Sequence, residues 1–87
     1  MTRTERKLLF KKCGEQRKLK RPEIRAALIL AEKSEADIAR SLGVSNAAIC
    51  RTIAGVTHAT YILDALIEAG VSPDLLSDPR EAIENAR

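Results

Sequence analysis

Helix-capping residues and glycines divide this chain into short segments whose apolar side chains recur at helical spacing. Ser34 and Ser45 each precede such a segment, and Gly43 and Gly55 each follow one. A serine at this place accepts a hydrogen bond from the first turn of a helix, whereas glycine readily adopts the left-handed conformation that ends one. Between these positions the apolar residues are separated by three or four residues, which predicts amphipathic helices. The chain is therefore expected to form a bundle of short helices.

The composition favours the same fold class. The 87 residues suffice for one domain with one small core. Aromatic residues make up only 2% of the chain, too few for most sheet or sandwich cores, and most of the commonest residues are strong helix formers. We therefore expect an all-α domain of four to five helices, with a basic N-terminal arm and a short C-terminal helix.

Basic residues are concentrated at the N-terminus. Residues 1–21 contain nine basic and two acidic side chains and carry a net charge of +7, whereas residues 22–87 carry −4. A basic segment before a compact module is typical of nucleic-acid-binding proteins, although it can also be a solvated tail. If about five of these charges lie near phosphates, the salt slope of DNA binding is about −4.5. The basic residues of the arm are Arg3, Arg6, Lys7, Lys11, Lys12, Arg17, Lys18, Lys20 and Arg21.

Local signals give the boundaries of the expected elements. Residues 3–13 are predicted to form a short helix that Gly14 ends, and residues 15–21 are predicted to be a linker. Pro22 begins the next helix, because proline suits the first helical turn, and Thr57 is the expected N-cap of a later one. The remaining expected helices span residues 22–33, 35–42, 46–54, the segment from Thr57 to 69, a short turn opening at 72–73, and 79–86.

Residues 34–55 have the spacing that a helix-turn-helix requires. Ala39 provides the small residue where the two helices cross closely, and Gly43 provides the turn. The apolar positions of the motif are filled by Leu42, Val44, Ile49 and Ile53. In such a motif the second helix can present its N-terminal half to the major groove of DNA.

Within this segment, IARSLGVSNAAICRTIAG resembles the lambda-repressor-like class of phage and bacterial regulators. The likeness extends over about residues 21–77. KRPEIRAAL is similar to the first helix of the short phage Ner-type regulators, and GVSPDLL is similar to the segment that closes their domain. Two residues depart from the pattern: Thr52 stands where the family more often has an apolar residue, and Glu35 where many relatives have a phosphate-binding Gln. The resemblance implies a DNA-binding domain at residues 22–77, between the arm at 1–21 and a terminal helix at 78–87.

The resemblance also implies that the second helix of the motif is a recognition helix for double-stranded DNA. Asn46 can pair with an adenine edge, and Arg51 with guanine or with a phosphate. The alternative for Asn46 is a surface residue that faces water, and for His58 a capping or surface role. The candidates for base contacts are Ser45, Asn46, Ala47, Ala48 and Arg51. The candidates for contacts with the DNA backbone are Ser34, Arg40, Thr57, His58 and Thr60.

On this basis the expected function is a phage- or prophage-type transcription regulator, a repressor that acts by operator occupancy. Related regulators pair as two-fold dimers on palindromic operators with half-sites about one helical turn apart, so a homodimer is expected. The dimer contact is expected either at the terminal helix through Ile83 or at the arm through Leu8, Leu9 and Phe10. Alternatively, Ile83 folds back onto its own domain.

Other function classes are less favoured by the sequence. A protein-interaction module, such as an antitoxin-like or adaptor domain, can use the same fold. An enzyme is not expected, because the chain lacks a catalytic Ser/His/Asp set and a Gly-rich phosphate loop. RNA binding is disfavoured by the scarcity of aromatic residues for base stacking.

Few ligand-binding features are present. One His and two Cys do not make a plausible zinc site, and neither a cofactor nor a small-molecule ligand is expected. No apolar run approaches the ~20 residues of a membrane span. We therefore expect a cytoplasmic protein, in bacteria or in a phage-infected host, that does not associate with a membrane.

Overall fold

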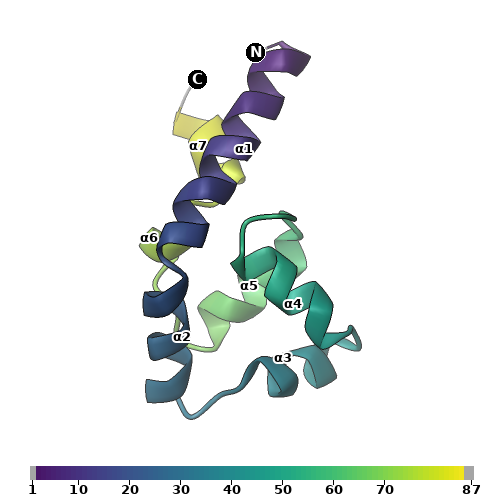
Figure 1. Cartoon of the computed structure of the whole chain (residues 1–87), viewed down its shortest axis with the longest axis vertical. Coiled ribbons are helices and arrows are strands. Elements are labelled where there is room, and N and C mark those ends of the chain that lie inside the picture. Colours follow the sequence, from purple (N-terminus) through teal and green to yellow (C-terminus); the bar gives the residue numbers. More distant parts are fainter. Residues whose placement is uncertain (1, 86–87) are drawn as a thin grey trace.

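Residues 2–85 are described by a computed structural model and form seven helices, with no strand in that range. The all-α prediction is thus confirmed. Residues 1, 86 and 87 lie outside the described part, so the predicted helix end at residue 86 is not tested. The helices are α1 (Arg3–Leu19), α2 (Arg21–Leu30), α3 (Glu35–Leu42), α4 (Asn46–Ile53), α5 (Thr60–Glu68), α6 (Pro73–Leu76) and α7 (Pro79–Asn85) (Figure 1).

The hydrophobic core lies where α2, α3, α4, α5 and α6 meet. Each of these helices buries the side on which its apolar residues recur at intervals of three or four, as expected for amphipathic helices. None of the helices within residues 2–85 has the length and apolar character needed to cross a membrane. The core residues are Ile24, Leu28, Ile38, Ala39, Ile49, Ile53, Ile62, Leu63, Leu66, Val71 and Leu76.

Helices α3 and α4 are capped as the sequence predicts. The Ser34 hydroxyl accepts a hydrogen bond from the Asp37 amide (3.0 Å), and the Asp37 carboxylate accepts one from the Ser34 amide (3.1 Å), which completes a capping box. Gly43 ends α3 with φ of +70°, and the Ser45 hydroxyl accepts from the Ala48 amide (3.2 Å) at the start of α4. Because Ala39 is small and buried, α3 and α4 pack closely across the turn.

The predicted end of the first helix is wrong. Helix α1 continues through Gly14 to Leu19, so the expected linker is largely helical. Gly14 is buried against the backbone of Gly55, and a Cβ at either glycine would collide with the carbonyl oxygen of the other. The glycine is therefore needed for the close approach of a helix to a loop and does not end α1.

The predicted cap of α5 is also wrong. Its N-cap residue is Ala59, which makes no side-chain capping hydrogen bond. The Thr57 hydroxyl instead lies 2.9 Å from the hydroxyl of Thr52. Thr52 is fully buried, and its hydroxyl donates to the Ala48 carbonyl (3.1 Å). A threonine can therefore occupy this core position, because its polar atom is hydrogen-bonded.

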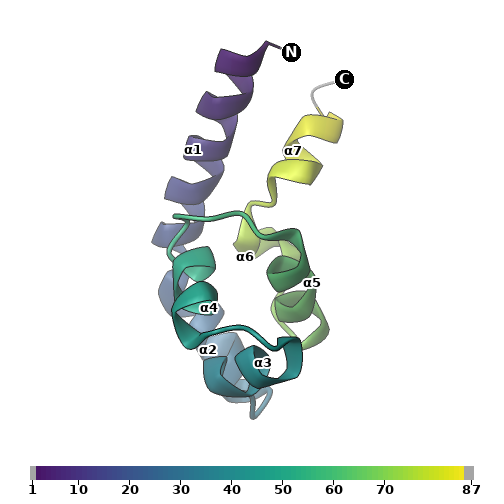
Figure 2. The same ribbon diagram turned by 90° about the vertical axis from the view of Figure 1, so that its right-hand side faces the viewer.

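Helices α1 and α7 lie side by side and extend beyond the core (Figures 1 and 2). The lower part of α1 also contacts α6, so the N-terminal segment is anchored on the domain. Ile83 of α7 is half-buried. Within this chain α7 thus lies along α1, and the dimer contact at Ile83 stays a prediction.

Candidate nucleic-acid interface

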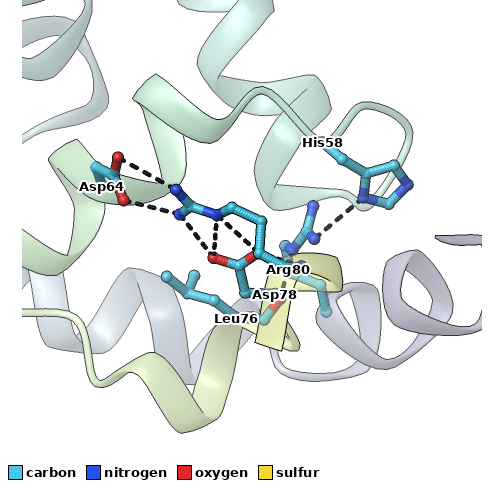
Figure 3. A network of polar contacts seen from close by, with 6 residues as sticks. His58, Asp64, Leu76, Asp78 and Arg80 are labelled. Atoms are coloured by element: carbon cyan, nitrogen blue, oxygen red, sulfur yellow. Dashed lines mark hydrogen bonds and ion pairs between the residues drawn. The ribbon is translucent and has the colours of Figure 1, made fainter. Parts of the chain in front are cut away.

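Arg17, which was expected to contact DNA as part of the arm, is fully buried, and that expectation is wrong. Its Nε donates to the Leu76 carbonyl (2.6 Å), and its Nη1 donates to the carbonyls of Thr52 (2.9 Å) and Thr57 (3.0 Å). Its Nη2 donates to Nδ1 of His58 (3.1 Å) (Figure 3). The planar guanidinium suits this set because its donors point in several fixed directions. Arg17 therefore fixes α1 to the ends of α4 and α6.

His58, a candidate for the DNA backbone, directs its Nδ1 toward the protein interior. A nitrogen that accepts from Arg17 carries no proton, so the ring is neutral with its proton on Nε2. Burial lowers the pKa of His58 below its usual 6.5, and the positive charge of Arg17 lowers it further. The Phe10 ring packs against His58 edge-on, with 5.3 Å between the ring centroids. His58 thus joins α1 to the loop between α4 and α5.

The outer side of α4 carries three of the five predicted base-contact residues. Asn46, Ala47 and Arg51 are exposed, and Ala47 and Arg51 lie one turn apart. Ala48 is half-buried and packs against the core. Ser45 is exposed, but its hydroxyl oxygen already accepts the capping hydrogen bond. The exposed surface of α4 is therefore formed mainly by the small side chain of Ala47, between the amide of Asn46 and the guanidinium of Arg51.

One edge of α4 is tied to the preceding helices. The Cys50 thiol donates to Glu35 (3.2 Å), and Arg25 of α2 lies 3.5 Å from the other oxygen of the same carboxylate. The hydrogen bond to Glu35 raises the pKa of the Cys50 thiol, and partial burial raises it further. Cys50 is therefore a protonated donor that helps to fix α4 relative to α2 and α3.

Arg51 differs from the arginines around it. Arg40 pairs with Asp37 (2.9 Å), and Arg80 pairs with Asp64 (2.8 Å) and with Asp78 (2.7 Å; Figure 3). Arg25 pairs with Glu35, as described above. Within residues 22–85, the basic side chains without such an ion pair are those of Arg51 and Lys33. The Arg51 guanidinium is thus available to an external acceptor.

Four exposed basic residues share one side of α1, and we term them the basic row: Arg3, Lys7, Lys11 and Lys18. Gly14 lies in the same row, since successive positions from 3 to 18 are separated by three or four residues. Because Gly14 contacts Gly55, just after α4, the basic row passes beside the C-terminal end of α4 (Figure 2). The row therefore passes near the end of α4 that carries Arg51.

The other basic residues of the segment are distributed differently. Lys12 is exposed on another side of α1, Lys20 pairs with Glu23 (3.5 Å), and Arg21 is half-buried. The Arg6 guanidinium lies 5.8 Å from the centre of the Phe10 ring, within the range of a cation–π contact. The charge of the N-terminal segment is thus concentrated in the basic row.

The remaining backbone candidates lie at two places on the domain. The Ser34 hydroxyl caps α3, and Arg40 is exposed on the same helix. Thr57 and Thr60 are exposed in the loop after α4 and at the start of α5. The two groups therefore lie at opposite ends of the α3–α4 unit.

Sequence reasoning missed the contact between Gly14 and Gly55 and the row that it organises. The signal is present in the sequence, because the positions from Arg3 to Lys18 that form the row follow one another at intervals of three or four residues. Gly14 hides it, because a glycine at such a position also indicates a helix end. Once α1 continues past Gly14, helical geometry places these residues on one side.

In comparisons with family models, with curated proteins and with solved structures, no match to this chain was found. Over the part of the chain that the structure describes, no three His, Cys, Asp or Glu side chains are grouped so as to hold a metal ion. The function is therefore inferred from the helices and their surface.

Proposed function

We propose that this protein is a sequence-specific transcription regulator that binds double-stranded DNA, with a lambda-repressor-like helix-turn-helix formed by α3 and α4. In this proposal α4 is the recognition helix, and the protein is a phage- or prophage-type repressor that acts by occupying its operator. The exposed side of α4 beside the basic row is the observation that carries the proposal.

The two surfaces have complementary roles. A helix in the major groove reads base edges, whereas lysines and arginines on phosphates provide affinity without sequence choice. Ala47 leaves room for a base edge to approach α4 or contacts a thymine methyl, and Asn46 and Arg51 provide hydrogen-bonding groups on either side. The basic row supplies positive charge that the domain otherwise lacks, since residues 22–87 carry −4.

The rigid attachment of α1 supports this division of roles. Arg17, His58 and the two facing glycines hold α1 against the loop that follows α4. The basic row is therefore fixed relative to α4, so phosphate contacts by the row also determine how α4 enters the groove. A flexible arm would provide affinity for DNA but would not determine how α4 enters the groove.

Replacing Arg51 with alanine tests the role of α4. If Arg51 reads a base, Arg51→Ala weakens binding to the preferred duplex by about 1–3 kcal/mol and affects an unrelated duplex little. Fluorescence anisotropy with both duplexes measures the difference. Arg40→Ala is the matched control, because Arg40 is an exposed arginine on α3 that pairs with Asp37. Equal weakening on both duplexes would instead assign Arg51 to a phosphate.

A protein-interaction module is the second candidate function. The observation that favours it is Glu35 at the start of α3, where a carboxylate repels a phosphate and cannot donate a hydrogen bond to it. Such a module would show no salt-sensitive binding to DNA, which separates the two proposals in the same anisotropy experiment.

A further inference from the structure

The side chain of Glu35, in the first turn of α3, contacts two other helices and is only 23% exposed. Its Oε2 accepts a hydrogen bond from the Cys50 thiol of α4 (3.2 Å), and its Oε1 lies 3.5 Å from Nε of Arg25 in α2. Oε1 is buried and has no hydrogen-bond partner among the described residues, so the ion pair with Arg25 is what offsets its charge. Glu35 therefore joins α2, α3 and α4 through one side chain.

The inward position of this carboxylate indicates a role other than stability. Removing a carboxylate from water is costly, and a largely buried ion pair returns little more than that cost. The best-attested use of such a pair is to fix one arrangement of the elements that it joins. The carboxylate also raises the pKa of the Cys50 thiol, so the thiol keeps the proton that it donates. The contacts of Glu35 thus determine how α4 is placed against α2 and α3.

Asn46 lies on the edge of α4 that Glu35 holds. It precedes Cys50 by four residues, about one helical turn, so the two side chains share that edge. Asn46, Arg25 and Glu35 also line one hollow of about 420 Å³ between α2 and the starts of α3 and α4. Arg51 follows Cys50 directly and therefore lies about 100° further round the helix. A change at Glu35 or Cys50 is thus expected to affect Asn46 more than Arg51.

The other end of α4 is held separately, by α1. Arg17 donates to the carbonyl of Thr52 (2.9 Å) in the last turn of α4, and Gly14 packs against Gly55 just after it. These contacts share no residue with those of Glu35. Loss of the Glu35 contacts is therefore expected to shift the start of α4 without releasing its end.

We propose that Glu35 and Cys50 are positioning residues, which fix the start of α4 and so hold Asn46 at the base edge that it reads. This inference rests on the proposed function, because it requires α4 to enter a major groove. Hydrogen bonds to a base edge tolerate only a narrow range of distances and angles, so a small shift of the start of α4 weakens the contact of Asn46. Glu35 then contributes to sequence choice without contacting DNA.

Selection of bound duplexes from a random pool tests the proposal position by position. Asn46→Ala and Arg51→Ala each relax the position of the motif that the replaced residue reads. Cys50→Ala removes the donor to Glu35 and is expected to relax the position read by Asn46, while the position read by Arg51 stays selective.

Each of the other outcomes is decisive. If Cys50→Ala selects the wild-type motif unchanged, or if Asn46→Ala relaxes no position, the positioning role is wrong and the proposed function stands. If wild-type protein enriches no motif, both are wrong.

Affinity measurements separate positioning from a general loss of structure. Fluorescence anisotropy gives the ratio of Kd for an unrelated duplex to Kd for the selected one, and Cys50→Ala is expected to lower this ratio by about fivefold or more. Cys50→Ser is expected to restore most of the ratio, because its hydroxyl can donate to the same carboxylate. Glu35→Gln removes the charge that pairs with Arg25 and is expected to lower the ratio as well.

Glu23→Gln is the matched control, since Glu23 is an exposed carboxylate on α2 whose ion-pair partner is Lys20. Circular dichroism verifies that each variant is folded. A lowered ratio that Cys50→Ser does not restore, or that Glu23→Gln shares, would overturn the positioning role of Glu35 and Cys50.

Discussion

Gly14 is where α1 depends on the absence of a side chain. In the middle of an exposed helix, replacing glycine with alanine stabilises a protein by up to about 1 kcal/mol. Here the added Cβ would collide with the Gly55 carbonyl, so we expect Gly14→Ala to lower the free energy of unfolding by about 1–3 kcal/mol. Urea denaturation measures the change, and the two mechanisms predict opposite signs. Gln16→Ala, at an exposed position two residues away, is the control and is expected to be close to neutral.

His58 gives the domain a pH-dependent stability. Its pKa is lower in the folded protein than the usual 6.5, because burial and Arg17 both disfavour the charged ring. The unfolded chain therefore binds the proton more readily, and stability falls as the pH drops below about 6.5 and continues to fall until the folded-state pKa is passed. Above pH 7 this contribution is complete.

Glutamine at position 58 separates this effect from other titrations. His58→Gln keeps a side-chain acceptor but removes the titration. We expect wild-type protein to lose stability between pH 7.5 and pH 5 more steeply than His58→Gln does, as measured by urea denaturation at each pH. The lowered pKa values of Asp37 and Asp78 affect stability only at more acidic pH. Parallel pH profiles for the two proteins would show that His58 remains free to titrate.

The role of Arg17 could not be predicted from the sequence. Its hydrogen-bond partners lie 35 to 59 residues away along the chain, so no local pattern reveals them. In the sequence Arg17 stands among other basic residues, so it is indistinguishable from a solvated arginine. The capping serines and the core positions of α3 and α4, by contrast, depend on contacts within a few residues, and these were predicted correctly.

At the scale of elements, α1 differs most from the sequence prediction. Glycine inside a helical pattern indicates either a helix end or the close approach of another backbone segment. Only the position of Gly55 decides between the two. Helices α3 and α4 were predicted almost to the residue, because caps and a turn glycine mark both ends. Their order and spacing are what motivated the expectation of a helix-turn-helix.

The basic row makes a quantitative prediction for α1. The logarithm of the DNA-binding constant falls linearly with the logarithm of the salt concentration, and each phosphate contact adds about 0.9 to the magnitude of that slope. Replacing Lys7, Lys11 and Lys18 together with alanine is therefore expected to reduce that slope by up to about 2.7. Lys12→Ala is the control, since Lys12 lies on another side of the same helix. An unchanged slope in the triple variant would remove α1 from the DNA interface.

At the scale of the whole molecule, contacts between distant segments hold α1, α2 and α4 together. Arg25 of α2 lies 3.5 Å from Glu35, and the Cys50 thiol of α4 donates to the same carboxylate (3.2 Å). Gly14 of α1 contacts Gly55 just after α4. The basic row and α4 are therefore expected to meet DNA as one unit.

Selection of bound duplexes from a random pool, at near-physiological salt, tests the central claim that α4 reads a DNA sequence. We expect wild-type protein to enrich one short motif and Arg51→Ala to enrich a relaxed form of it. If no sequence is enriched by wild-type protein, α4 does not read bases. Residual binding that disappears with the lysines of the basic row would then come from phosphate contacts alone.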